Sequence, residues 1–186
     1  MKSTFVLRLS KLLSHKLTLV ISFALLTAVA AQIAVPVKPV PFTLQTMAVV
    51  LAGAFLGSKR GFQSQIIYLA LGLVGLPVFA LSADATFGFA RLIGPTGGYL
   101  LAFPLAAYLV GFIIERYKNY ISVIAAMFLG NVVIVASGSF YLDAFFIHNL
   151  SESLKVGAVL FSVWTVIKVM LSASIYFGIK KSTESK

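Results

Sequence analysis

The chain has 186 residues, of which 60% are apolar and 11% charged, and its formal net charge is +10. A water-soluble domain of this length could not bury so much apolar surface, and the mean hydropathy of +1.01 is typical of an integral membrane protein. The sequence contains no cysteine, which excludes disulfides, haem attachment and thiolate metal sites.

Six apolar stretches are predicted to cross the membrane as helices. They cover approximately residues 17–35, 43–57, 62–80, 97–114, 120–141 and 156–179. We therefore expect an all-α integral membrane protein whose six transmembrane helices form one compact bundle, with residues 1–186 as a single membrane domain. The second stretch is short, near the lower limit for crossing about 30 Å of hydrocarbon.

The cations separate onto the two sides of this predicted topology. One side carries most of them: Lys2, Arg8, Lys11, Lys16, Lys59, Arg60, Arg116, Lys118, Lys180, Lys181 and Lys186. The other side carries Lys38, Arg91 and Lys155, while Lys168 lies within the last stretch. Because positively charged loops stay in the cytoplasm, both termini are predicted to be cytoplasmic in a plasma-membrane protein. The same distribution explains the net charge without nucleic acid as a partner.

The first apolar stretch allows two interpretations. Basic residues, an apolar core and the sequence Ala28-Val29-Ala30 fit a cleavable signal peptide. The apolar run continues to Val35, however, and is long enough to span, so we favour a retained first helix. Ala24 and Ala28 lie four residues apart, as do Ala30 and Ala34, so each pair lets another helix approach closely.

The predicted outer loop before the fourth helix contains Asp84 and Arg91 and leads into Gly94-Pro95-Thr96-Gly97-Gly98-Tyr99. Glycines at Gly97 and Gly98 allow the backbone to approach a ligand, and the N–H groups at a helix start suit an anion. A tight turn before a helix accounts for the same sequence equally well.

Two polar side chains fall inside predicted helices. Asn131 lies near the middle of the fifth helix and needs a hydrogen-bond partner inside the bundle, either another helix or a ligand. Lys168 lies about midway along the last stretch, where a lysine costs roughly 2.5–3.5 kcal/mol on insertion. We interpret Lys168 as part of a polar cavity or a partner of an anionic ligand, with a lysine that snorkels to the interface as the alternative.

No motif for enzymatic chemistry is present. The sequence lacks a phosphate-binding loop, a G-x-S-x-G elbow and an H-E-x-x-H pair, and its acidic residues lie in terminal or connecting regions. His15 and His148 lie in connecting segments without ligand spacing, so no metal site is expected. The sequence therefore predicts neither an enzyme nor a cofactor, and any active transport would need energy from another subunit.

Three motifs carry a resemblance to a known family. They are Val40-Pro41-Phe42-Thr43-Leu44-Gln45-Thr46, then Leu71-Gly72-Leu73-Val74-Gly75-Leu76-Pro77-Val78-Phe79-Ala80, and Gly94-Pro95-Thr96-Gly97-Gly98-Tyr99-Leu100. In these motifs the chain resembles the BioY family, the biotin-specific substrate-binding subunits (S components) of energy-coupling factor (ECF) vitamin transporters. The resemblance implies a six-helix protein for biotin uptake, with a biotin pocket near its extracellular side. It also implies docking onto a transmembrane coupling subunit driven by two ATP-binding subunits.

The resemblance assigns roles to individual residues. Arg91 and Lys168 fall on the positions expected to pair with the biotin carboxylate. The matching motifs contribute the residues expected to line the pocket: Phe42, Thr43, Gln45, Gly97, Gly98 and Tyr99. The face formed by Ala24 and Ala28 resembles the family's small-residue surface for the coupling subunit.

One position departs from the family pattern. Thr165 stands where the family has an acidic residue that accepts hydrogen bonds from the biotin ureido group, for which Asn131 is a second candidate. Threonine can accept such a bond, but without assistance from charge. Weaker biotin binding, or preference for another small carboxylate such as a biotin precursor, therefore stays open. A structural membrane protein whose Lys168 pairs with a partner helix is the alternative of a different class.

Overall fold

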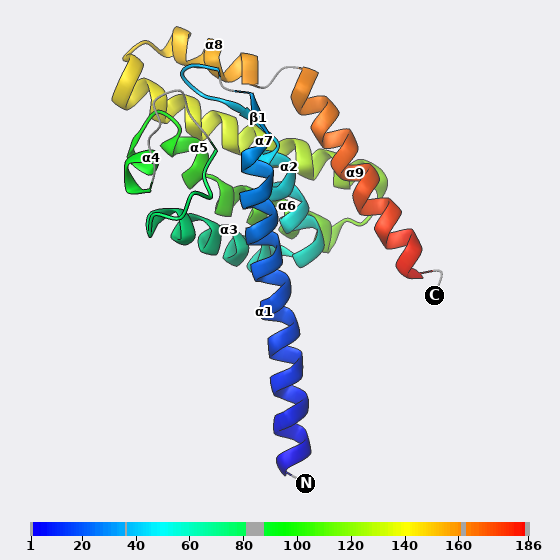
Figure 1. Ribbon diagram of the computed structural model, residues 1–186. Coiled ribbons are helices and arrows are strands. Elements are labelled where there is room, and N and C mark those ends of the chain that lie inside the picture. Colours follow the sequence, from blue (N-terminus) through cyan, green and yellow to red (C-terminus); the bar gives the residue numbers. More distant parts are fainter. Residues whose placement is uncertain (1, 36, 81–87, 161–162, 185–186) are drawn as a thin grey trace.

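The helices of this protein follow the apolar stretches of its sequence (Figure 1). The computed structural model describes residues 2–35, 37–80, 88–160 and 163–184. Within them, 4 helical segments are long and apolar enough to cross a membrane: His15–Gln32, Gly97–Arg116, Tyr120–Ile147 and Val163–Ser182. The chain is thus a multi-pass membrane protein. A further apolar helix, α2 (Gln45–Leu56), is shorter.

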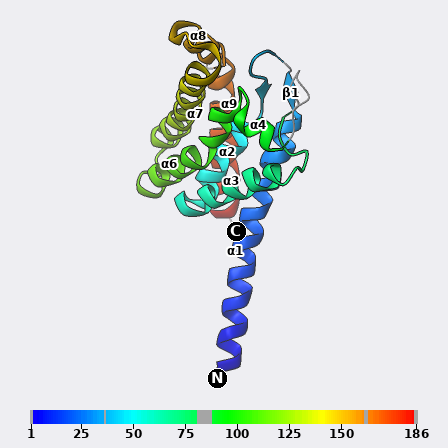
Figure 2. The same cartoon turned by 90° about the vertical axis from the view of Figure 1, so that its left-hand side faces the viewer.

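The first helix, α1 (Lys2–Gln32), is longer than the predicted first stretch. Its N-terminal half extends away from the other helices (Figures 1 and 2). At its other end a short antiparallel ribbon forms from β1 (Ala34–Val35) and β2 (Phe42–Thr43), with Ala34 opposite Thr43. Helix α2 begins directly after this ribbon, so the ribbon and the first turn of α2 are held together.

The Ala24 and Ala28 side chains of α1 pack inside the chain. Ala24 has 0% of its surface exposed and Ala28 has 9%. Both belong to the apolar core that includes Tyr68 and Leu69 of α3 (Ser58–Leu73). The alanines do allow a helix to approach closely, as the sequence predicts, but the helices that approach are this chain's own α2 and α3.

Helices α2 and α3 cross α6 (Phe103–Arg116) at the centre of the molecule. A Cβ atom at Gly53 would lie 2.3 Å from the carbonyl oxygen of Ala107, so this crossing depends on glycine. Glu115 caps the start of α3, because its carboxylate accepts hydrogen bonds from the Ser58 N–H at 2.8 Å and the Ser58 hydroxyl at 2.9 Å.

Helix α3 ends at Leu73, earlier than the predicted end of the third stretch at residue 80. Gly75 has φ of +93°, a left-handed conformation that ends helices and favours glycine. Pro77 then has no N–H with which to continue the hydrogen-bond ladder of α3. The residues after it run beside the end of α1, where the Gln32 side chain donates hydrogen bonds to the carbonyl oxygens of Pro77 at 3.3 Å and Phe79 at 3.5 Å.

The fourth predicted stretch is divided into α5 (Gly97–Leu101) and α6, and it is preceded by the short helix α4 (Phe89–Ile93). Pro104 lies in the first turn of α6, where its missing N–H costs no hydrogen bond. Asp84 of the preceding loop lies outside the described residues. Helix α7 (Tyr120–Leu142) agrees with the predicted fifth stretch and starts at a capping bond from Ser122 N–H to Asn119 Oδ1.

The sixth predicted stretch, 156–179, is not one helix. Its first residues belong to α8 (Leu150–Leu160) and its later ones to α9 (Val163–Glu184), which is long enough to cross. Helix α8 follows the short π-helix η1 (Asp143–Ile147). Helix α8 packs against α7, and a Cβ at Gly157 would lie 2.1 Å from Ser139 Oγ. Helix α8 thus packs on α7 through Gly157 and is an element distinct from α9.

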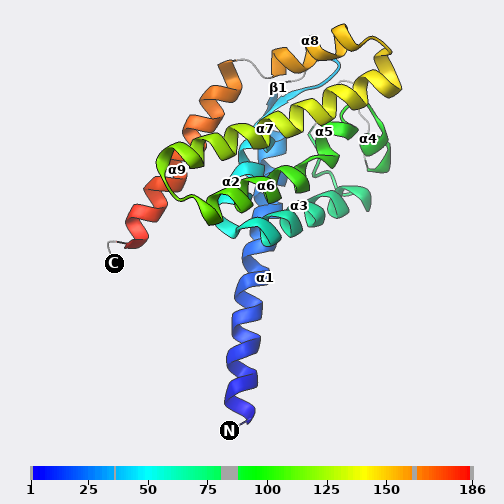
Figure 3. The same ribbon diagram turned by 180° about the vertical axis from the view of Figure 1, so that it is seen from behind.

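The ribbon and α8 lie at one end of the molecule, and the N-terminal end of α1 and the C-terminal end of α9 lie at the other (Figures 1 and 3). Helices α2, α6 and α7 lie between these ends, and α9 crosses beside α2 and α7. This arrangement brings the start of α2 to the N-terminal part of α9, although they are far apart in the sequence.

Candidate functional site

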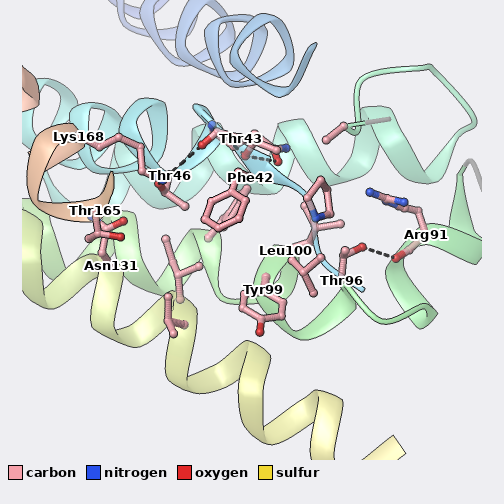
Figure 4. A pocket seen from close by; sticks show the side chains of 17 residues that line it. Phe42, Thr43, Thr46, Arg91, Thr96, Tyr99, Leu100, Asn131, Thr165 and Lys168 are labelled. Carbon is pink, nitrogen blue, oxygen red and sulfur yellow. Dashed lines mark hydrogen bonds between the residues drawn. The ribbon is translucent and has the colours of Figure 1, made fainter. Parts of the chain in front are cut away.

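A cavity lies where β2, the start of α2, α4, α5, α7 and α9 meet (Figure 4). Its free volume is 60 Å³, less than the roughly 300–1,000 Å³ usual for small-molecule sites. Phe42 lies in the middle of the labelled side chains. A bicyclic or aromatic ligand would therefore fit only after Phe42 or a neighbouring side chain moved.

Lys168 forms one end of this cavity. Its ammonium donates hydrogen bonds to Thr46 Oγ1 at 2.8 Å and to the carbonyl oxygen of Thr43 at 3.3 Å. The residue is 9% exposed, and no acidic side chain lines the cavity in the described part of the chain. A charge inside an apolar helix is thus held by two neutral oxygen atoms, and it keeps capacity to pair with an anion or a polarised carbonyl.

Thr165 and Asn131 lie at the same end of the cavity as Lys168 (Figure 4). Each is 2% exposed. Thr165 precedes Lys168 by three residues, so both side chains face the cavity from one side of α9. The Asn131 amide donates to the carbonyl of Met127 at 2.9 Å within its own helix, so its carbonyl oxygen is the atom suited to accept from a ligand.

Arg91 forms the opposite end of the cavity from Lys168 (Figure 4). It lies in α4, is 4% exposed, and its carbonyl oxygen accepts a hydrogen bond from Thr96 Oγ1 at 3.5 Å. The two cations therefore bracket the cavity rather than converge on one point. A single carboxylate in this arrangement pairs with one of them.

The glycines of the G-P-T-G-G turn do not line the cavity. A Cβ at Gly97 would lie 1.9 Å from the carbonyl oxygen of Leu92, and one at Gly98 would lie 2.2 Å from the Cβ of Tyr141. Both glycines thus serve close packing, which is the tight-turn interpretation of this sequence. Tyr99 does line the cavity, with its ring packed on Gly138 and its hydroxyl directed toward α7.

A hydrogen-bond chain fixes the wall formed by β2 and α2. Thr43 Oγ1 donates to Gln45 Oε1 at 3.1 Å, and the Gln45 amide donates to the hydroxyl of Tyr68. Tyr68 in turn donates to the carbonyl oxygen of Val78 at 3.2 Å. Gln45 lines the cavity as predicted, but its amide is engaged with Tyr68, so the structure indicates a positioning role.

Several lining residues were not predicted from the sequence: Val40, Pro41, Thr46, Ala80, Thr96, Leu100, Phe103, Ile134 and Val135. Some of them lie inside the quoted motifs, and Thr46, three residues after Thr43 at the start of a helix, could have been identified by that spacing. Phe103 and Ile134 carry no such signal, because apolar helix residues that line a cavity look the same as core residues in a sequence.

Comparisons with known proteins agree with this architecture. The sequence model of the BioY family matches residues 2–185. The chain is 38% identical to the "Biotin transporter BioY" of Thermotoga maritima over 159 residues, which cover 86% of this chain and 92% of that protein. It is 44% identical to the "Probable biotin transporter BioY" of Lysinibacillus sphaericus over 128 residues, 68% of this chain and 63% of that protein.

A solved structure has the same fold. It is a crystal structure at 2.1 Å of the S-component for biotin from an ECF-type ABC transporter. It superposes on this chain with a TM-score of 0.83 and 27% sequence identity, covering 92% of this chain and 93% of the other.

Proposed function

This chain belongs to the BioY family, and from that premise we propose that it is a membrane-embedded biotin-binding subunit that mediates biotin uptake. The observation that carries the proposal is the buried cavity with a cation at each end, in a chain related over almost its whole length to biotin transporters. The protein is accordingly a transport protein and not an enzyme.

The layout of the cavity matches the layout of biotin. Biotin has a ureido group at one end, a carboxylate at the other, and an apolar ring and chain between them. The cavity has polar groups at both ends, and Phe42, Leu100 and Ile134 among its apolar walls. An apolar middle with few polar groups at defined places is typical of small-molecule sites.

The separation of the two cations favours one orientation of the ligand. Arg91 would pair with the carboxylate, because a guanidinium forms two parallel hydrogen bonds with that group. At the other end, Thr165 and the Asn131 carbonyl oxygen would accept from the ureido N–H groups, and Lys168 would donate to the ureido carbonyl. This assigns an acceptor to each ureido N–H group and a donor to the ureido carbonyl.

Binding would also require the cavity to enlarge. Its free volume of 60 Å³ is too small for biotin, so Phe42 and the ribbon that carries it would move outward as the ligand enters. Such a ligand-dependent rearrangement stabilises the state that binds biotin more tightly.

We expect this subunit to work with membrane partners. The cation distribution supports six crossing helices with both termini in the cytoplasm. As the family resemblance implies, a transmembrane coupling subunit and two ATP-binding subunits would supply the energy for transport. The face of α1 around Ala24 and Ala28 stays the proposed contact with the coupling subunit, through residues beside these two buried alanines.

A second candidate function is an S component for another small carboxylate. It is favoured by Thr165, which lines the cavity at the position where the family has an acidic residue. Competition between labelled biotin and unlabelled analogues, including open-chain precursors, separates the two. Displacement by a precursor at lower concentration than by biotin itself would favour this second function.

The deciding experiment is calorimetric titration of biotin into the purified, folded protein. We expect one-site binding that is lost or at least roughly 100-fold weaker in Lys168→Ala, since removal of a buried charged hydrogen-bond partner costs about 3 kcal/mol or more. Lys181→Ala, in the last turn of the same helix, is the matched control and should bind normally. Absence of any binding by the unchanged protein would contradict the proposed function.

A further inference from the structure

A second cavity adjoins the biotin pocket. It lies between α8 and the loop that joins β1 to β2, and its free volume is 220 Å³. Val40 and Phe42 line both cavities, so these two side chains form the wall between them. Among the described residues, Val40 and Phe42 therefore separate a small molecule in the second cavity from the pocket.

The second cavity is lined by two cations. Lys38 comes from the loop between the strands and Lys155 from α8, and both side chains are exposed. No acidic residue lines this cavity within the part of the chain that the structure describes. The fold thus brings two positive charges from distant parts of the sequence to the edge of the pocket.

The distribution of cations over the whole chain adds to this observation. Lys38, Arg91 and Lys155 are the cations that the predicted topology places on the outer side. The fold gathers all of them around two adjoining cavities, with Arg91 in the pocket and both lysines in the cavity next to it. Outer loops of membrane proteins carry few cations, so their convergence indicates a use for positive charge at this place.

We propose that the second cavity is an outer vestibule, in which Lys38 and Lys155 attract the carboxylate of the incoming vitamin before it passes Phe42 into the pocket. The inference rests on the proposed function and adds a capture site to it. Charges beside a low-dielectric wall concentrate an oppositely charged ligand and raise its association rate. Because the bound ligand lies beyond Phe42, the two lysines would not hold it and the dissociation rate would be unaffected.

The test is a stopped-flow measurement of biotin association and dissociation in discs of neutral phosphatidylcholine. The variant Lys38→Gln with Lys155→Gln is compared with Lys59→Gln with Lys181→Gln, which removes the same charge from exposed lysines on the predicted cytoplasmic side. Both variants are measured with biotin and with neutral biotin amide, at about 20 mM and about 500 mM salt, because salt screens such attraction.

At low salt the variant Lys38→Gln with Lys155→Gln should associate with biotin at least roughly five-fold more slowly than the control variant. Electrostatic steering raises association rates by about 10–1,000-fold. This difference in association rate should shrink at high salt and be absent for biotin amide. The dissociation rate should be the same in both variants. If the lysine variant associates with biotin as fast as the control variant does, the vestibule proposal is overturned and the proposed biotin binding is unaffected. Failure of the unchanged protein to bind biotin overturns the proposed function and the vestibule with it.

Discussion

Lys168 Nζ donates a 2.8 Å hydrogen bond to Thr46 Oγ1, which ties the N-terminal part of α9 to the first turn of α2. The bond joins residues 122 positions apart and lies at one end of the pocket. Because the ammonium also bonds to the carbonyl of Thr43 at 3.3 Å, two of its three protons are directed by the protein. The remaining donor is thereby oriented toward the cavity.

Replacing Thr46 should weaken biotin binding through this orientation. Thr46→Val keeps the shape of the side chain and removes the hydroxyl acceptor, so the ammonium loses one of the two oxygens that direct it. Hydrogen bonds to charged groups contribute about 1.5–3 kcal/mol, and we expect the dissociation constant to rise roughly ten-fold or more. Thr46→Ser keeps the hydroxyl and should bind like the unchanged protein. Equal affinities for Thr46→Val and Thr46→Ser, measured by calorimetry, would show that Lys168 does not depend on Thr46.

The proposed orientation of biotin predicts a selective effect of Arg91. Arg91→Gln should lower affinity for biotin roughly 100-fold, because a bidentate charged pair is lost, and should change affinity for biotin amide little. Lys168→Gln should weaken binding of both ligands, since the amide retains the ureido group. The reverse pattern, with Lys168→Gln affecting biotin alone, would place the carboxylate at the α9 end of the pocket.

Restoring an acidic residue at Thr165 should tighten binding. In Thr165→Asp the new carboxylate would accept from the ureido N–H groups with assistance from charge, which roughly doubles the strength of such bonds. Lys168, one turn later on the same face of α9, would compensate the buried negative charge. We expect the dissociation constant to fall roughly ten-fold, and Thr165→Val to raise it. Competition of labelled with unlabelled biotin measures both changes, and weaker binding by the Asp variant would argue against a ureido role for this position.

Gly98 should be required for folding rather than for ligand contact. Gly98→Ala would place a Cβ atom 2.2 Å from the Cβ of Tyr141, and overpacking of this kind costs about 1–3 kcal/mol. The melting temperature should fall by several degrees. Gly178→Ala is the matched control, because no atom lies within 4 Å of the added methyl, and it should melt at the same temperature or higher. If Gly98→Ala kept its melting temperature and lost its affinity for biotin, Gly98 would have a role in ligand binding rather than in folding.

The sequence predicted the helices where hydropathy and local signals agree. Helix α7 was predicted within one residue at each end, because its apolar residues extend over almost its whole length. The last helix was predicted to start too early, because hydropathy detects apolar residues and not what covers them. Helix α8 packs on α7, and a pattern of apolarity cannot distinguish such a helix from the start of the next one.

The same limit applies to the site and to the partner surface. The family motifs identified Phe42, Thr43 and Tyr99 as lining residues, and the charge within an apolar helix identified Lys168. The spacing of Ala24 and Ala28 predicted close approach of a helix but could not say which helix. The opposite placement of Arg91 and Lys168 was also beyond the sequence, because it depends on how α4 and α9 are arranged in space.

The bond between Lys168 and Thr46 has a consequence for biogenesis. The start of α2 is synthesised well before α9, so the polar end of the pocket is complete only after α9 has been synthesised. Until then the Thr46 hydroxyl lacks the hydrogen bond that Lys168 later donates to it. A chain that stops before α9 should insert its earlier helices and yet hold no vitamin.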